Sequence, residues 1–160
     1  MKRLWMLGAI ALSGLLWGCG AEKIPSAPHV PPASNLPSEA PATRALTIFV
    51  ADAQCSHLVP RTTQIALLPE KGRYAEVAIA QVIANQPINN FFIEKVSVSI
   101  KEHTAIVDFI LEAQSPRRLV SLSSCEQFAL LQAIHKTLTE NQQLDITKVR
   151  FLESGQDIYL

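Results

Sequence analysis

The chain has 160 residues, 48% of them hydrophobic, and its 14 lysine and arginine residues balance 14 aspartate and glutamate residues. That length accommodates one domain of ordinary size and a terminal extension. The region 46–160 carries ten basic and twelve acidic residues, a net charge of −2, without a basic stripe or an acidic tract. This composition argues against nucleic acid as a partner, and against a strongly cationic partner.

The first 18 residues have the layout of a bacterial export signal. Lys2 and Arg3 precede an apolar stretch from Leu4 to Trp17, so that a charged segment is followed by a short hydrophobic one. A membrane-spanning helix needs about 20 apolar residues, which is more than this stretch offers. We therefore expect the segment 1–18 to be a signal peptide that is cleaved.

The signal ends in Leu16-Trp17-Gly18-Cys19, which resembles the lipobox of bacterial lipoproteins, although Trp17 is larger than the usual residue there. The resemblance implies that Cys19 carries lipid, and several acyl chains, at about 0.8 kcal/mol per buried methylene, would hold the protein on a membrane. Gly20, in place of an aspartate, favours the outer membrane if the cell has two. The alternative is an ordinary signal peptide whose cysteine is incidental.

Residues 19–45 have the composition of a linker. Six of the ten prolines lie here, interleaved with alanine and serine. Such a segment cannot bury enough apolar surface to offset the entropy of ordering it. We expect a semi-extended tether of about 3 Å per residue where it adopts polyproline geometry.

The domain that follows, 46–160, begins with extended segments and a helix. Leu46–Val50 is rich in β-branched and aromatic residues and predicts a strand. His57–Leu68 predicts a second strand, in which Pro60 indicates an edge or an irregular start. The spacing of apolar residues from Lys71 to Ala84 predicts an amphipathic helix.

A hairpin is predicted next. Apolar and polar residues alternate from Val96 to Lys101, as in a half-buried strand. Glu102-His103 is the turn. The strand Ala105–Leu111 is more apolar on both faces, which indicates a central position.

The strongest predicted helix lies between residues 123 and 141. Ser123 or Ser124 can cap it, with Glu126 or Gln127 three residues later completing a capping box. Its expected buried stripe is Leu130, Leu131, Ile134 and Leu138. A last strand, Lys148–Glu153, completes the order β-β-α-β-β-α-β, which predicts a two-layer α+β sandwich with the helices on one sheet face.

Four segments, "LTIFVADAQCSHLVPRTTQIA", "KVSVSIKEHTAIVDFIL", "CEQFALLQAIHKTLTEN" and "KVRFLESGQ", together resemble the GerMN domain, found in a spore germination protein and in envelope lipoproteins. The chain departs from the family pattern in two places. The segment between the first helix and the hairpin lacks the usual glycine- and proline-rich approach, and the turn at Glu102-His103 lacks its usual glycine. The resemblance implies a non-catalytic module on the outer side of a membrane.

Cys55 and Cys125 remain as a pair once Cys19 is assigned to lipid. In an exported protein they are candidates for a disulfide, which would close a loop of about 70 residues and stabilise the fold by roughly 4 kcal/mol in the chain-entropy model. Two independent thiols are the alternative, because pairing requires Cα atoms within about 7 Å.

No enzyme motif emerges from the sequence. His57, His103 and His135 are isolated, so neither a metal nor another cofactor is expected. Asp108 lies between apolar neighbours, where a charge needs hydrogen bonds or a cation. We interpret Asp108, Glu126 and Gln127 as structural or binding residues. The alternative is a hydrolase acting on cell-wall material, with Asp108, Glu126 and His135 in one pocket.

The sequence therefore predicts a lipid-anchored, extracytoplasmic protein of the bacterial cell envelope. Its expected partners are the membrane, through the lipid, and an envelope protein or cell-wall component. Self-association is a further expectation.

Overall fold

The computed structural model describes residues 42–158. The predicted signal peptide, the lipid site at Cys19 and most of the predicted linker lie outside the described residues. Among the described residues, none of the helices combines the length and the apolar character that a membrane crossing requires.

The described chain forms an α+β domain with the predicted order of main elements. The elements are β1 (Thr43–Ala51), β2 (Leu58–Ala66), α1 (Lys71–Asn85), β3 (Ile93–Lys101), β4 (Thr104–Leu111), η1 (Leu119–Ser121), α2 (Ser124–Gln127), η2 (Phe128–Gln132), α3 (Ala133–Glu140), η3 (Gln142–Leu144), β5 (Lys148–Glu153) and β6 (Gln156–Asp157). β1 starts at Thr43, inside the segment whose composition is that of a linker.

The strands form two sheets rather than one. β1 and β2 make an antiparallel hairpin, and the second sheet has the order β3-β4-β5-β6, in which β4 and β5 are parallel. β4 is central, as its apolar character predicts. Pro60 lies in β2, a strand with no neighbour beyond β1, so the prediction of an edge is confirmed.

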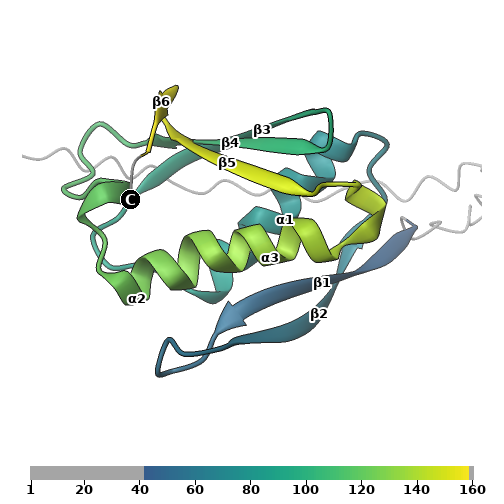
Figure 1. Cartoon of the computed structure of the whole chain (residues 1–160), viewed down its shortest axis with the longest axis horizontal. Helices are drawn as coiled ribbons and strands as arrows, with labels where there is room; N and C mark the ends of the chain where they lie inside the picture. The colour runs from purple at the N-terminus through teal and green to yellow at the C-terminus, as the bar shows by residue number, and fades with distance from the viewer. Residues whose placement is uncertain (1–41, 159–160) are drawn as a thin grey trace, which may run out of the picture. The chain divides into compact units, whose positions relative to one another are not determined.

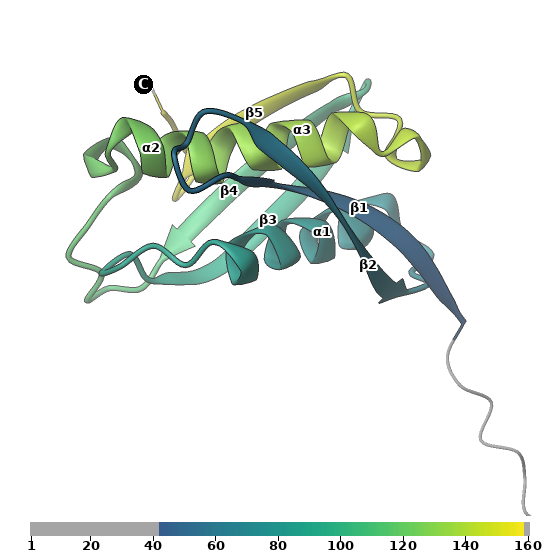
Figure 2. The ribbon, with the colours of Figure 1, turned by 90° about the horizontal axis from the view of Figure 1, so that it is seen from below.

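The helices lie between the two sheets (Figure 1). They cover one face of the four-stranded sheet, as expected, and the β1–β2 hairpin crosses their other side (Figure 2). The expected two-layer arrangement therefore gains a third layer. The hairpin separates because the free edge of β1 contacts the helices instead of another strand.

The core fills the space between these layers. Tyr74, Ala78 and Val82 of α1 are buried, and so are Val107 and Phe109 of β4. The predicted stripe of the long helix is also buried at Leu130, Leu131, Ile134 and Leu138. Apolar burial on this scale is the main favourable term in folding.

The long helix is continuous from α2 through η2 to α3, but η2 is a π-helical turn. Short π segments inside α-helices widen the helix and often lie at functional sites. The periodicity of the sequence predicts a single helix here and gives no sign of the wider turn.

Candidate functional site

Asp108 lies on the outer face of the four-stranded sheet. Its neighbours Val107 and Phe109 are fully buried towards the helices, and successive side chains of a strand point to opposite faces. The Asp108 carboxylate is half-buried and accepts a hydrogen bond from the Gly155 N–H at 3.0 Å. It therefore holds the β5–β6 turn.

Glu126 occupies the capping box at the start of α2. The Ser123 N–H and hydroxyl both donate to Glu126 Oε2 at 2.8 Å, and Ser123 Oγ accepts from the Glu126 N–H. Of the two predicted capping pairs, Ser123 with Glu126 is the one formed. The box satisfies backbone groups that a helix start leaves without partners.

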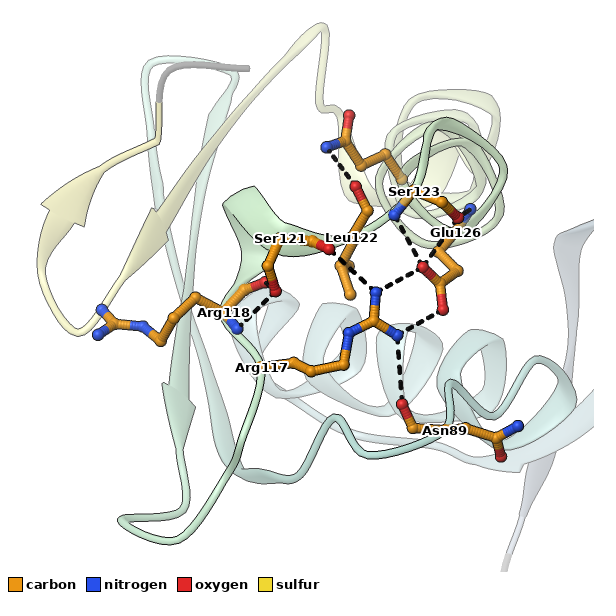
Figure 3. Close-up of polar contacts among 8 residues, drawn as sticks. Asn89, Arg117, Arg118, Ser121, Leu122, Ser123 and Glu126 are labelled. Atoms are coloured by element: carbon orange, nitrogen blue, oxygen red, sulfur yellow. Dashed lines mark hydrogen bonds and ion pairs between the residues drawn. The ribbon is translucent and has the colours of Figure 1, made fainter.

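Arg117 completes this cluster (Figure 3). Its guanidinium donates to both Glu126 oxygens at 2.7 Å, and also to the carbonyls of Ser121 and Asn89 at 3.0 and 3.3 Å. The bidentate geometry gives the pair more strength than a single contact would. One guanidinium thus joins three segments of chain, those around Asn89, Ser121 and Glu126.

The electrostatics of the cluster follow from these bonds. The hydrogen bonds from Arg117, and then those from Ser123, lower the pKa of Glu126 from 4.5 to about 2. The hydrogen bond to Glu126 in turn raises the pKa of Arg117. Both groups are held in their charged forms, which suits an ion pair that fixes structure rather than a carboxyl that exchanges protons near neutral pH.

The three residues of the hydrolase hypothesis are not brought together. Asp108 points away from the helical layer, in which Glu126 and His135 lie, and the His135 side chain is exposed. Gln127 donates its side-chain amide to the Leu122 carbonyl at 3.0 Å, in the segment just before the helix. Each predicted carboxylate therefore has its own separate structural partner.

Cys55 and Cys125 form a disulfide, with Cα atoms 5.3 Å apart. Cys55 lies in the loop between β1 and β2 and has a positive φ of 54°, while Cys125 lies in the first turn of α2. The bridge ties the tip of the hairpin to the start of the long helix.

Asp52 organises the loop that carries Cys55. Its carboxylate accepts from the Ser56 N–H at 2.7 Å, the His57 N–H at 3.1 Å and the Ser56 hydroxyl at 2.8 Å. These bonds, with the His57 N–H the largest contribution, lower the pKa of Asp52 to about 2. The backbone N–H of His57 thus helps to fix this loop, although the His57 side chain is 80% exposed.

Side chains from the helical layer cap the free edge of β1, a feature that the sequence analysis missed. Phe49 N–H donates to Thr137 Oγ1 at 2.9 Å, and Ala51 N–H donates to Gln86 Oε1 at 2.7 Å. Asn141 Nδ2 donates to the Thr47 carbonyl at 2.7 Å. The sequence offers a signal for two of the three residues, since Gln86 and Asn141 are polar residues at or just beyond the ends of predicted helices.

A largely apolar groove of about 430 Å³ lies between α1 and the start of β3. Its floor consists of Val77, Ala80, Ile83 and Ala84 from α1 and Ile93 and Val96 from β3. Its rim carries Arg73, Glu76, Glu94 and Lys95. We call this surface the α1–β3 groove.

The described residues offer no evident place for a metal. Within 42–158, no three histidine, cysteine, aspartate or glutamate side chains are grouped so that they could hold an ion. Nor does this part of the chain leave a buried side-chain nitrogen or oxygen atom without a hydrogen-bond partner.

These elements define an α+β domain with the GerMN fold. A similar solved structure is that of the tandem GerMN domains of the sporulation protein GerM from Bacillus subtilis, with a TM-score of 0.52 and 18% sequence identity. The match covers 73% of this chain and 41% of that chain, so this chain spans less than half the length of its structural relative. No family model and no curated protein matches the sequence.

Proposed function

We propose that this chain is a lipid-anchored protein of the bacterial cell envelope whose GerMN-fold domain binds another protein or a cell-wall component without catalysis. The observation that carries this proposal is the use made of the two candidate carboxylates. Asp108 holds a turn on one side of the sheet, and Glu126 is bound by Arg117 and Ser123 on the other. These partners support a structural role for both carboxylates.

The anchoring part of the proposal is supported by the sequence. Cys19 ends an export signal, and a proline-rich segment separates it from the domain. The Cys55–Cys125 disulfide suits an exported protein, because disulfides persist in oxidising compartments. The domain would then act at the end of a tether, within reach of partners on or near the membrane.

A first experiment tests the anchor. Cys19→Ala should move the full-length protein from the membrane fraction to the soluble fraction of cells, with the Ser26→Ala variant as a control that keeps both the lipid site and the disulfide. If Cys19→Ala leaves the membrane fraction unchanged, the lipid anchor is wrong.

A second experiment tests the binding role. The full-length protein is crosslinked in envelopes, solubilised in detergent and captured, and the captured proteins and glycans are identified by mass spectrometry. A stoichiometric envelope partner or glycan is the expected result. Hydrolysed cell-wall fragments generated by the purified protein would instead favour the enzyme alternative.

A further inference from the structure

The outer edge of β2 is a row of main-chain groups without a neighbouring strand. β1 and β2 pair antiparallel in one continuous register, and no other strand in the described part of the chain lies beside β2. The Leu67 N–H donates to the Ala42 carbonyl at 2.9 Å, which makes these two residues a hydrogen-bonded pair. Because hydrogen-bonded and non-hydrogen-bonded pairs alternate along the hairpin, the odd-numbered residues of β2 direct their N–H and C=O groups towards β1. The even-numbered residues direct theirs away from it.

The contacts of β1 agree with this alternation. The N–H groups of Phe49 and Ala51 point away from β2 and donate to side chains of the helical layer. In β2, the N–H groups of Thr62, Gln64 and Ala66 point the other way, out of the hairpin. None of these three donors has a hydrogen-bond partner among residues 42–158. The hairpin therefore has one edge that is capped and one that is open.

The open edge is protected only in its first half. Proteins block unpaired strands with prolines, charges, bulges or covering segments. Pro60 and Arg61 supply the first two, and the N–H that Pro60 lacks would have pointed outward, so the hairpin loses no bond. From Thr62 to Ala66 there is no proline, charge or bulge. The alternating donors and acceptors of such a stretch are complementary to an extended peptide chain, which joins as a further strand.

The side chains of β2 favour a second copy of β2 as that strand. Val59 and Leu67 are 44% and 48% exposed, and they lie four residues before and four residues after Thr63. If two β2 strands pair antiparallel about a two-fold axis at Thr63, Val59 of each copy lies opposite Leu67 of the other. Cross-strand apolar pairs of this kind stabilise a sheet. The same register places Arg61 opposite Ile65, so the two arginines are kept apart.

This register also satisfies the open donors. Thr62 and Gln64 of each copy exchange N–H···O=C bonds with Gln64 and Thr62 of the other. The Ala66 N–H of each copy donates to the Pro60 carbonyl of the other, so that proline is needed only as an acceptor. The outer strands of the resulting sheet are the two β1 strands, whose edges the helical layers cap. The assembly therefore closes as a dimer and leaves no open edge for a third copy.

We propose that two copies of this chain associate through β2, antiparallel about a two-fold axis at Thr63, to form one four-stranded sheet in the order β1-β2-β2-β1. The proposal goes beyond the proposed function, since it names a surface and its occupant. It is independent of the lipid at Cys19. The dimer would present two binding domains from one site on the membrane.

The first test is the oligomeric state of the full-length protein in detergent, measured by analytical ultracentrifugation over a range of concentrations. The wild type is expected to be a concentration-dependent dimer. Gln64→Pro removes an outward N–H and leaves the bonds within the hairpin in place, so it should raise the dimer Kd by about tenfold or more. Gln64→Ala keeps that N–H and should leave the Kd close to the wild-type value. Circular dichroism spectra that match the wild type show that both variants are folded.

The second test is the register of the two strands, measured by disulfide crosslinking. Residues that face each other as a non-hydrogen-bonded pair have Cα atoms about 4.5 Å apart, within the range that a disulfide requires. Thr63→Cys should therefore give a covalent dimer on a non-reducing gel after mild oxidation. Thr62→Cys is the matched control, because Thr62 lies opposite Gln64 and the two introduced cysteines would be more than about 7 Å apart. It should remain a monomer on the same gel.

Three results would overturn the proposal. The first is a wild-type protein that is monomeric at every concentration, and the second is a folded Gln64→Pro protein that dimerises like the wild type. The third is crosslinking of Thr62→Cys as readily as Thr63→Cys, because the strands would then not pair about Thr63. If Gln64→Pro does not fold, the two cysteine variants still decide. The capture experiment on the proposed function can succeed or fail independently of these outcomes.

Discussion

The carboxylate of Glu126 accepts four hydrogen bonds, two from Arg117 and two from Ser123. Its pKa is about 2 in the folded protein against an ordinary value of 4.5. Because the unfolded state binds more protons between these values, the contribution of Glu126 is complete above about pH 4.5 and is lost as the pH falls towards 2.

The substitution Glu126→Gln tests this contribution. It should lower the free energy of unfolding at pH 7 by about 1–2 kcal/mol, since a charge-assisted hydrogen bond becomes a neutral one. Urea denaturation of the variant and the wild type from pH 7 to pH 2 provides the measurement. The difference between the two should shrink below about pH 4.5, and a difference independent of pH would contradict the role of the charge.

Asp108 provides a second test at the level of single residues. Asp108→Ala removes the acceptor for the Gly155 N–H and should lower the free energy of unfolding by about 0.5–1.5 kcal/mol. Asp108→Asn keeps a side-chain oxygen and should cost less. Thermal unfolding measures both variants, and a stable Asp108→Asn protein that had lost a cell-wall hydrolase activity of the wild type would revive the enzyme hypothesis.

Among the elements, the β3–β4 hairpin turns through two residues in an uncommon conformation. Glu102 and His103 have φ values of 45° and 63°, as the two central residues of a type I′ turn require. Glycine and asparagine adopt this region most readily. The chain has glutamate and histidine here instead, so the turn stores some strain.

Replacing Glu102 should relieve that strain. Glu102→Asn is expected to raise the free energy of unfolding by about 0.5–1 kcal/mol, because asparagine is favoured at the first central position of this turn. The measurement is the urea midpoint of the purified protein. Lys101→Asn, one residue earlier in strand geometry, serves as the control and should give no gain.

The elements also show which features could be predicted from the sequence and which could not. The capping box at Ser123 and the buried stripe of the long helix are local patterns, and both are confirmed. Arg117 was not identified, because it lies in a loop without periodicity and meets Glu126 only in the folded chain. The third layer was missed for a related reason, since no local pattern tells which sheet a strand joins.

At the scale of the whole molecule, the Cys55–Cys125 disulfide joins the hairpin layer to the helical layer across 70 residues of sequence. The sequence suggests this pair only because Cys19 is assigned to lipid and two cysteines remain. It cannot show that they pair, because the distance between their Cα atoms depends on the complete fold. The bridge restricts the unfolded chain and so stabilises the native state.

Removal of the bridge should weaken the whole domain. The double variant Cys55→Ser/Cys125→Ser is expected to lose about 2–4 kcal/mol of unfolding free energy, measured by urea denaturation. Wild-type protein that is alkylated and run with and without reductant should differ in gel mobility. Equal mobility would show that the bridge does not form in the purified protein.

The capping of β1 by helical side chains also affects the order in which the domain can fold. Thr137 and Asn141, which satisfy Phe49 and Thr47, follow them by 88 and 94 residues. Contacts this distant in sequence form late, because a long loop must close first. During synthesis, β1 therefore leaves the ribosome long before Thr137 and Asn141 are made. Until these two residues, in the last quarter of the chain, have emerged, the edge of β1 that they cap stays open to wrong pairing. A chaperone that protects this hairpin would contribute most before α3 is made.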